Sequence, residues 1–276
     1  MKLKCLLVSI ALYGVLIIGV VIFLFPFYFM VIGSFKESSE ILSIHFTFLP
    51  EKGFHLEKYI GLIRFVNFGR AVINSSIVAS SYTLLALFFC SLGGFAFAKY
   101  NFPGRNWLFT FLLVTMMIPG QAGIIASYLL MKWLHWLDTF YPLIIPGVAN
   151  AFGIFLMRQY ISSIPDELID AARIDGCSDF RIYYQIILPL VSGGLVVLGI
   201  IFFMGTWNDF FWPLIVINSR EKFTVQLALQ RLFAIGHERD YGMIMAGATL
   251  CSVPLIVIFL VFCRRFIAGI LSGAFR

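Results

Sequence analysis

The chain has 276 residues, of which 61% are hydrophobic and only 12% are charged. A soluble domain of this size carries roughly twice that charged fraction, so the composition indicates a polytopic membrane protein. The formal charge of +6 is spread over the predicted loops and forms no clustered basic face, which argues against a nucleic-acid partner.

Six apolar runs are each long enough to cross a bilayer, which takes about 20 residues of helix. The first run follows Lys2 and Lys4 and continues too far, without a small-residue cleavage site, for a removable signal with an apolar core of about 7–15 residues. The fifth run contains Gly199, Gly205 and Pro213, which predict a kink or break. We therefore expect one all-α transmembrane domain over residues 1–276, with six transmembrane helices near 5–32, 73–98, 107–130, 140–161, 187–217 and 243–262.

The positions of lysine and arginine predict the orientation, because these residues are enriched in short cytoplasmic loops. The side that holds both termini carries Lys2, Lys4, Lys99, Arg105, Arg158, Arg173, Arg181, Arg264, Arg265 and Arg276. The opposite loops carry as many basic residues, but over longer segments where the rule is weaker. The pattern favours cytoplasmic termini, a cytoplasmic tail over 264–276 and a cytoplasmic loop over about 164–189.

Two longer segments, 36–72 and 218–242, fall on the outer side of this arrangement. In the second segment, Val225, Leu229 and Leu232 have the spacing of one face of a short amphipathic helix. The histidines lie in outer loops or at their edges without ligand spacing, and they are His45, His55, His135 and His237. We interpret them as ordinary surface residues.

The sequence contains no pattern typical of catalysis or metal binding. The cysteines have neither metal-ligand nor disulfide spacing, which indicates small buried hydrophobic residues, and they are Cys5, Cys90, Cys177, Cys251 and Cys263. No nucleophile–base pair and no G-x-x-x-x-G-K-[ST] phosphate loop is present. We expect a chain that is not an enzyme, has no metal site and does not hydrolyse ATP itself.

The loop over 164–189 is a polar interruption between the fourth and fifth apolar runs. Asp166 and Glu167 follow Pro165, and acidic residues suit the first turn of a helix, where they meet the positive end of its dipole. Gly176 permits a positive φ and is a natural helix stop. The sequence predicts a first short helix that ends near Gly176 and a second over 180–187.

The same loop contains an ordered motif of small, acidic and apolar residues. Asp170-Ala171-Ala172 is followed by Gly176 and then by Ile186, Leu188 and Pro189. This order resembles the signature loop of ABC-importer permeases, in which Glu-Ala-Ala, a glycine and Ile-x-Leu-Pro have these spacings. The small side chains of Ala171, Ala172 and Gly176 let a partner surface approach the backbone. Asp170 departs from the usual glutamate, which brings the carboxylate one methylene closer to the backbone.

Further segments extend the resemblance to the carbohydrate-uptake group of ABC importers. These segments are MIPGQ at 117–121, AFGIFLMRQY at 151–160, WNDFFWPL at 207–214 and RRFIAGILSGAFR at 264–276. The last of them resembles the end of the shorter permease subunit of the maltose system. The resemblance implies a type I ABC-importer permease fold in the plasma (inner) membrane, with the signature loop coupled to a separate ATPase.

The same resemblance implies the partners of the chain. They are a homologous second permease subunit, a dimer of cytoplasmic ATPase subunits, an extracytoplasmic solute-binding protein and the lipid bilayer. No cofactor is expected on this chain, because ATP and Mg are used by the partner ATPase. The outer segment 223–237 matches a loop that reaches the binding protein in the maltose system, so Phe223, Gln230 and His237 are candidate contacts.

Polar residues inside a predicted span should face the bundle interior or a wet cavity. Asn208 and Asp209 are such residues, and Trp207 and Trp212 beside them suit the apolar faces of a sugar. Gln121 and Asn150 are similar candidates for the substrate path. The resemblance implies that the partner permease supplies most of the substrate contacts.

Two other interpretations remain open. An ABC permease for a non-sugar solute such as a polyamine would share the signature loop. An ion-coupled secondary transporter would need ionisable residues deep in several spans, where only Asp209 qualifies. A membrane-embedded hydrolase lacks any candidate catalytic group.

Overall fold

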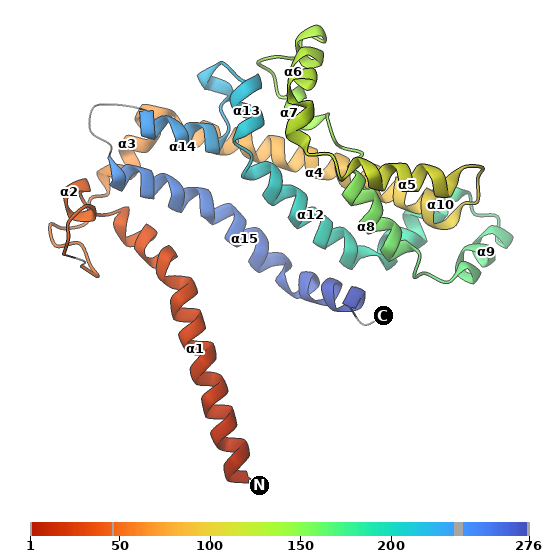
Figure 1. Ribbon diagram of the computed structural model, residues 1–276, viewed down its shortest axis with the longest axis horizontal. Coiled ribbons are helices and arrows are strands. Elements are labelled where there is room, and N and C mark those ends of the chain that lie inside the picture. The colour runs from red at the N-terminus through yellow and green to blue at the C-terminus, as the bar shows by residue number, and fades with distance from the viewer. Residues whose placement is uncertain (1, 46, 235–239, 275–276) are drawn as a thin grey trace. The chain divides into compact units, whose positions relative to one another are not determined.

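The chain forms helices only, within the ranges described by the computed structural model (Figure 1). These ranges are 2–45, 47–234 and 240–274. The expected all-helical fold is therefore confirmed. The chain divides into two compact units, here called the first unit and the second unit, which comprise residues 1–69 with 228–253, and residues 70–227 with 254–276.

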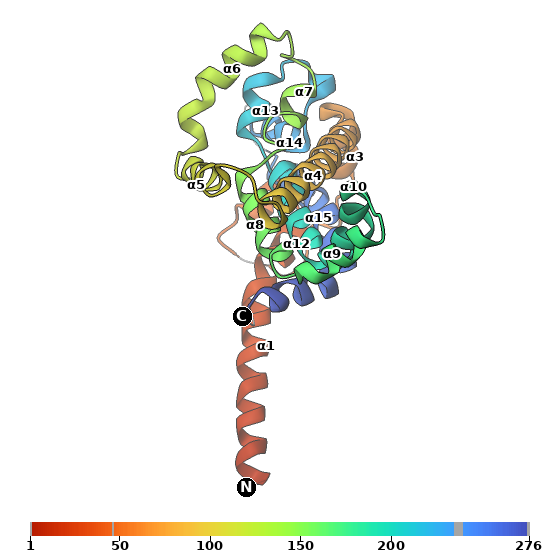
Figure 2. The same ribbon diagram turned by 90° about the vertical axis from the view of Figure 1, so that its right-hand side faces the viewer.

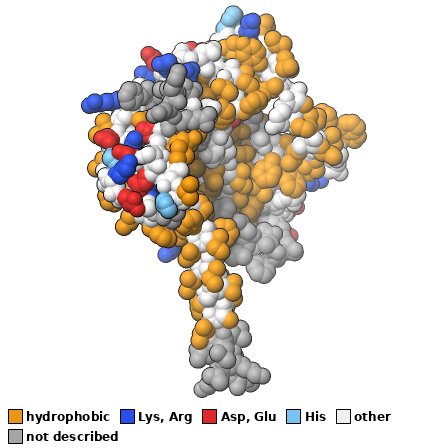
Figure 3. Space-filling model, turned by 60° about the vertical axis from the view of Figure 1, so that its left-hand side comes forward, with side chains coloured by type: hydrophobic (Ala, Val, Ile, Leu, Met, Phe, Trp, Pro, Cys, Tyr) orange, Lys and Arg blue, Asp and Glu red, His pale blue; other side chains and the backbone are white. Residues whose placement is uncertain are grey.

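The first unit begins with a long apolar helix. Its elements are α1 (Lys2–Gly33), α2 (Ser38–Ile41), α3 (Glu57–Val66), the end of α14 (Val225–Ala234) and the start of α15 (Tyr241–Ala274). The most apolar window of α1 contains no buried residue, and Figure 3 shows hydrophobic side chains on the surface of the described part of the helix. Helix α1 therefore needs a hydrophobic environment from outside the chain.

Polar side chains close the turn that follows α1. Lys36 Nζ donates to the carbonyl and to the hydroxyl of Thr47, at 2.6 Å each, and lies 3.3 Å from the Glu40 carboxylate. Lys58 Nζ donates to Asp240 at 2.8 Å, which ties α3 to the residue before α15. The predicted outer segment is thus held by buried and half-buried charges.

The second unit contains most of the remaining helices. They are α4 (Phe68–Lys99), α5 (Arg105–Thr115), α6 (Ile124–Trp133), α7 (Tyr141–Ile144), α8 (Ala151–Ile161), α9 (Asp166–Ile174), α10 (Asp179–Ile182), α11 (Leu188–Leu190), α12 (Ser192–Trp207) and α13 (Phe211–Val216). A π-helical turn (Tyr183–Ile187) and 3₁₀ turns (Gly120–Gly123 and Arg220–Lys222) join them. The predicted amphipathic helix is confirmed as α14, with Val225 and Leu232 buried and Leu229 half-buried.

The core of the second unit lies where α8 packs against α4 and α12. Met157 and Ile161 of α8 are fully buried, and they share one apolar cluster with Cys90 and Phe95 of α4 and Leu198 of α12. Since α9 follows α8 after only four residues, this packing also fixes where α9 begins.

Fewer helices than predicted are long enough to cross a membrane. Within the described ranges three qualify, Ser9–Gly33, Phe68–Lys99 and Tyr241–Arg264. Counting each bent pair as one span gives up to five, the pairs being Arg105–Thr115 with Gly120–Trp133 (90°) and Asp179–Leu190 with Ser192–Trp207 (81°). The fourth predicted run is divided into α7 and α8 at Pro146 and Gly147, and α8 has only 11 residues. The six-span arrangement and the cytoplasmic position of both termini therefore stay predictions.

The fifth predicted run breaks at two places, between Leu190 and Ser192 and between Trp207 and Phe211. Neither break lies at Gly199 or Gly205, which are inside the continuous helix α12. Pro213 lies in the first turn of α13, where a backbone N–H has no helical partner to lose. Figures 1 and 2 show α9 at one end of the second unit and α6, α7 and α13 at the other.

Candidate functional site

Helix α9 has the start and the stop that its sequence predicts. Pro165 precedes the first turn, which contains Asp166 and Glu167. The helix ends before Gly176, whose φ is +76°. The N–H of Cys177 donates to the carbonyl of Ala172 at 2.9 Å, a bond typical of a helix closed by a left-handed glycine.

The two faces of α9 have different surroundings. Ile169 and Ala172 are buried, at 3% and 7% exposure, in the apolar core of the second unit. Asp170 and Ala171 are exposed. The expectation that Ala172 faces a partner therefore needs correction, because its methyl group packs inside this chain.

Gly176 leaves little side-chain bulk next to the exposed Ile174 at the end of α9, and Leu168 in the first turn of the helix is also exposed. No atom lies within 4 Å of the position that a Cβ on Gly176 would take. Ile174 is 87% exposed and Leu168 is 46% exposed. Ile174 therefore leaves an apolar side chain available for contact at this end of α9.

The second half of the loop leads back into the apolar part of the unit. Ser178 caps α10 by accepting a hydrogen bond from the N–H of Arg181 at 3.4 Å. The helix predicted over 180–187 is present, and it continues through the π-helical turn into α11. The distal motif residues lie at this return, with Ile186 and Leu188 half-buried and Pro189 exposed.

Basic side chains fasten α9 to the end of α4. Lys99 Nζ donates to Asp166 Oδ1 at 2.5 Å. The Arg173 guanidinium lies over the Tyr100 ring at 5.6 Å and donates to Asp179 at 3.3 Å. Burial and the neighbouring Asp179 carboxylate raise the pKa of Tyr100. The loop is thus attached to the last residue of α4 at the start of α9 and to Tyr100, which follows α4, at the end of α9.

A second connection runs through the core. The Tyr183 hydroxyl lies 2.7 Å from Ser91 Oγ of α4, and both side chains are buried. Because Tyr183 belongs to the π-helical turn, the return segment of the loop is also bonded to α4.

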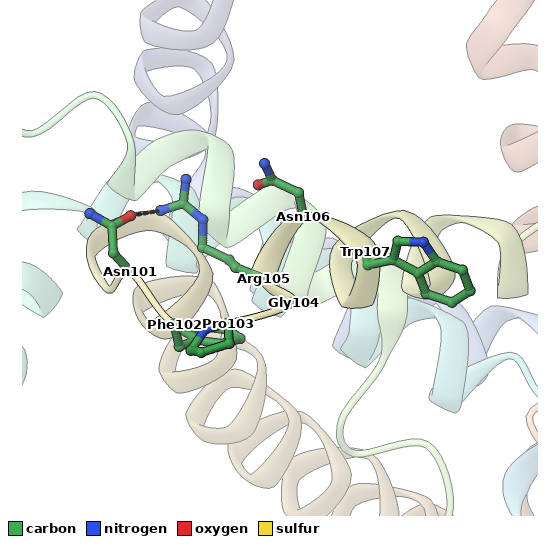
Figure 4. A pocket seen from close by; sticks show the side chains of 7 residues that line it. All are labelled: Asn101, Phe102, Pro103, Gly104, Arg105, Asn106 and Trp107. Carbon is green, nitrogen blue, oxygen red and sulfur yellow. Dashed lines mark hydrogen bonds between the residues drawn. The ribbon is translucent and has the colours of Figure 1, made fainter.

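The turn between α4 and α5 borders an open hollow of about 580 Å³ (Figure 4). The Arg105 guanidinium donates to Asn101 Oδ1 at 2.8 Å and to the carbonyl of Tyr100 at 3.1 Å, which closes the turn. Gly104 in this turn has φ +80°, and no atom lies within 4 Å of the position that its Cβ would take. Gly104 therefore resembles Gly176 in backbone conformation and in free space.

A cavity of about 400 Å³ lies at the opposite end of the second unit, between α6 and α13. We call it the α6–α13 pocket. Its lining residues are Gly120, Gln121, Ile124, Ser127, Leu130, Met131, Pro146, Asp209, Phe211 and Trp212. Polar groups and aromatic rings thus face one space, an arrangement typical of small-molecule sites.

Breaks in two helices create this pocket. The chain bends by 90° between α5 and α6, which places Gln121 on a short 3₁₀ turn. It breaks again between α12 and α13, where Asp209 Oδ1 accepts a hydrogen bond from the N–H of Trp212 at 3.4 Å. The Trp212 indole N–H donates to the carbonyl of Pro142 at 2.9 Å, which fixes the ring.

Three of the six predicted path residues line the pocket, namely Gln121, Asp209 and Trp212. Asn208 lies beside them and is exposed, with its Oδ1 accepting from Gln226 at 3.2 Å. Trp207 is fully buried and stacks on Phe203, so it supports the wall instead of lining it.

Asn150 has a structural task in this arrangement. Its Oδ1 accepts from the N–H of Gly153 at 3.2 Å and so caps the start of α8. It does not line the α6–α13 pocket. Phe211, an aromatic neighbour of Asp209 in the segment 207–214, also lines the pocket. The sequence does not single out Ser127, which lines it too, because serine is not an unusual residue type at its position.

The candidate contacts for a binding protein have different positions. Phe223 is buried with Val78, Leu143 and Val216 in a cluster of its own unit, so the expectation that it contacts a partner needs correction. Gln230 on α14 is exposed and stays a candidate. His237 lies outside the described residues.

Comparisons with known proteins agree on one family. The sequence profile described as "Binding-protein-dependent transport system inner membrane component" matches residues 91–272. The chain is 33% identical over 257 residues to the arabinooligosaccharides transport system permease protein AraQ of Bacillus subtilis (strain 168), covering 92% of this chain and 91% of that protein. It is 33% identical over 267 residues to the sn-glycerol-3-phosphate transport system permease protein UgpE of Escherichia coli O1:K1 / APEC, covering 94% of each.

Solved structures share the fold. A chain of a bacterial ABC transporter involved in the import of the acidic polysaccharide alginate has a TM-score of 0.83 and 22% identity, covering 94% of this chain and 96% of that one. A chain of a bacterial alginate ABC transporter in complex with a pentasaccharide-bound periplasmic protein has a TM-score of 0.67 and 17% identity, covering 94% of each. Likeness at these identities establishes the fold alone.

Proposed function

Because this chain belongs to the family of binding-protein-dependent transport system inner membrane components, we propose that it is a permease subunit of a sugar importer driven by a separate ATPase. In this proposal it pairs with a homologous second permease in the plasma (inner) membrane. An extracytoplasmic binding protein delivers the solute. ATP and Mg are used by the ATPase subunits.

The exposed end of α9 is the observation that carries the proposal. Ala171 and Gly176 present little bulk there, and Ile174 beside them is 87% exposed. A cleft on the ATPase would bury this apolar side chain and approach the backbone at the small residues. The bonds of Lys99 and Tyr183 to the loop and to α4 support transfer of the motion into the helices.

The α6–α13 pocket supports a sugar as the solute. Gln121, Ser127 and Asp209 supply hydrogen-bonding groups, and Phe211 and Trp212 supply rings that suit the C–H faces of a sugar. The permease of Bacillus subtilis named above belongs to a system for arabinooligosaccharides. We extend that substrate class, sugars, to this chain.

Gly176→Arg tests the proposed docking. Arginine fills the open space beside α9, so the ATPase can no longer approach closely. The chain is co-expressed with its partner permease, ATPase and binding protein and reconstituted in liposomes. We expect ATP-dependent uptake and stimulation of the ATPase by the binding protein both to be lost, while the chain still inserts in the membrane.

Gly104→Arg is the matched control. It introduces the same side chain at a glycine with nearly the same positive φ and the same free space, but outside α9. We expect this control to retain most of the uptake. Full uptake by Gly176→Arg would contradict the proposed function, and equal loss in both variants would attribute the defect to backbone strain.

A further inference from the structure

We infer that Asp209 makes the α6–α13 pocket selective for uncharged, hydroxyl-rich solutes and unfavourable for anionic ones. The inference rests on the proposed function, because it assigns the charge class of the solute that the permease conducts. It concerns a residue that lines the pocket, in contrast to the docking loop on which the proposed function depends.

Asp209 gives the pocket its negative charge. Its side chain is half-buried, and none of the described residues that line the pocket is basic. The backbone N–H of Trp212 donates to Oδ1, but a neutral N–H donor leaves the charge of the carboxylate in place. An ionised Asp209 therefore presents a net negative charge to any solute that enters.

The carboxylate retains capacity for a ligand. A carboxylate can accept about four hydrogen bonds, and hydroxyl groups of a solute are suitable donors. Gln121 can both donate and accept, and so can the Ser127 hydroxyl. The ring of Trp212 is fixed by its bond to Pro142 and forms an apolar wall. Hydroxyl edges and C–H faces of an uncharged saccharide match this combination.

An anionic solute meets repulsion in the same place. A carboxylate or phosphate inside a cavity of about 400 Å³ lies within a few ångströms of the wall. This distance is shorter than the Debye length of about 8 Å at physiological ionic strength, so salt screens the repulsion only weakly. Placing like charges together at a binding site is a common basis of discrimination against the wrong ligand.

The charge of the pocket decides a question that sequence similarity leaves open. One relative is named for arabinooligosaccharides, which are uncharged, and another for sn-glycerol-3-phosphate, which is anionic, and both are 33% identical to this chain. Equal identity to both gives no reason to prefer either class. The carboxylate of Asp209, which has no basic neighbour among the described residues that line the pocket, favours the uncharged class.

Binding to the assembled transporter without its binding protein tests the inference directly, because the binding protein would otherwise select the solute first. Calorimetry compares arabinotriose, trigalacturonate and spermidine as probes. In the native transporter we expect trigalacturonate to bind at least about tenfold more weakly than arabinotriose. In Asp209→Asn we expect this ratio to fall about tenfold, mainly through tighter binding of trigalacturonate.

Glu221→Gln is the matched control, since it removes one exposed negative charge that does not line the pocket. It should leave the ratio unchanged. Equal binding of both trisaccharides by the native protein, or an unchanged ratio in Asp209→Asn, overturns the inference. Preferred binding of spermidine also overturns it and indicates a cationic solute.

Failure of this inference is distinguishable from failure of the proposed function. If no probe binds while Gly176→Arg abolishes the ATP-dependent uptake that the native transporter shows, the permease function stands and the pocket is not the solute site. If Gly176→Arg has no effect on uptake, the docking role fails whatever the probes do.

Discussion

The ammonium group of Lys99, the last residue of α4, lies 2.5 Å from Oδ1 of Asp166, the first residue of α9. The Lys99 side chain is only 4% exposed, and it also donates to the carbonyl of Ile164. A buried cation is therefore satisfied by two groups at the start of the loop over 164–189. Through these two bonds, Lys99 holds the start of α9 against the end of α4.

Lys99→Met is predicted to weaken the coupling of ATP hydrolysis to solute uptake more than it weakens assembly of the transporter. Methionine keeps the apolar stem but leaves the carbonyl of Ile164 without its buried donor, a loss of about 1–3 kcal/mol in local stability. We expect ATPase activity to persist while the ratio of solute taken up to ATP hydrolysed falls several-fold. This uptake-to-hydrolysis ratio is measured in liposomes from phosphate release and solute uptake.

Asp166→Asn is the comparison for this prediction. The Asp166 side chain is 77% exposed, so its ion pair alone is worth little, on the order of 0–1 kcal/mol. Asparagine should therefore change the ratio only slightly. An equal and large effect of both variants would show that the ion pair, and not the buried bond to the carbonyl, holds the loop.

Gly94→Ala is predicted to destabilise the second unit. A Cβ at this position would lie 2.7 Å from Met157 Cβ and 2.8 Å from the backbone nitrogen of Arg158, so α4 and α8 would have to separate. Such overpacking costs about 1–3 kcal/mol. The measurement is thermal unfolding of the detergent-solubilised chain.

Gly69→Ala in the same helix provides the opposite expectation. No atom lies within 4 Å of its Cβ position, so an alanine at this position meets no neighbouring atom. We expect its unfolding temperature to be equal to or above that of the native chain. An equal fall in unfolding temperature for both variants would contradict the attribution of the Gly94→Ala loss to the crossing with α8.

Asp138 is predicted to stabilise the protein in a manner that depends on pH. Burial acts to raise its pKa, but hydrogen bonds from Ser219 and Asn218, with the charge of Lys222, outweigh burial and lower the pKa from 3.8 to about 2. A lowered carboxyl pKa contributes stability above the unfolded value of 3.8. This contribution is lost as pH falls through about 2.

Asp138→Asn tests this dependence. The side chain is 28% exposed, so solvent reduces the contribution to about 1–2 kcal/mol at pH 7. We expect the variant to unfold at a lower temperature than the native chain at pH 7, with a difference that shrinks between pH 4 and pH 2. A difference that is constant over this range would contradict the role of the charge.

Local signals explain why α9 is predictable from the sequence. The acids after Pro165 and the glycine at position 176 act on their immediate neighbours, and the helix has the expected start and end. The direction of a side chain depends instead on distant packing. The sequence places Ala172 and Phe223 at partner surfaces, yet both are buried by residues far away in sequence.

The break after Trp207 in the fifth apolar run is a second case in which the sequence predicts a feature but not its exact position. Gly199 and Gly205 predict a weakened helix, but a glycine keeps its backbone N–H and can remain helical inside an apolar run. The helix ends where Asn208 and Asp209 form hydrogen bonds with the nearby backbone, at Met204 and Trp212. The fastening of α9 by Lys99 has no such local signal, because a basic residue at the end of a span indicates orientation alone.

The buried pair of Lys36 and Glu40 yields the last prediction. Their side chains are 4% and 5% exposed and lie 3.3 Å apart, and Glu40 also accepts from Thr47 and from the N–H of Glu51. Lys36→Met removes the cation and leaves a buried carboxylate without its counter-charge, at a cost of about 3–5 kcal/mol. Lys36→Met with Glu40→Leu removes both charges and should recover part of that loss, since an apolar pair needs no compensation. Limited proteolysis of segment 36–57 measures both variants, with faster cleavage expected for the single substitution. If the double variant is cleaved faster than the single one, the pair does not act as an isolated charge couple, and the hydrogen bonds of Glu40 to Thr47 and Glu51 hold the segment instead.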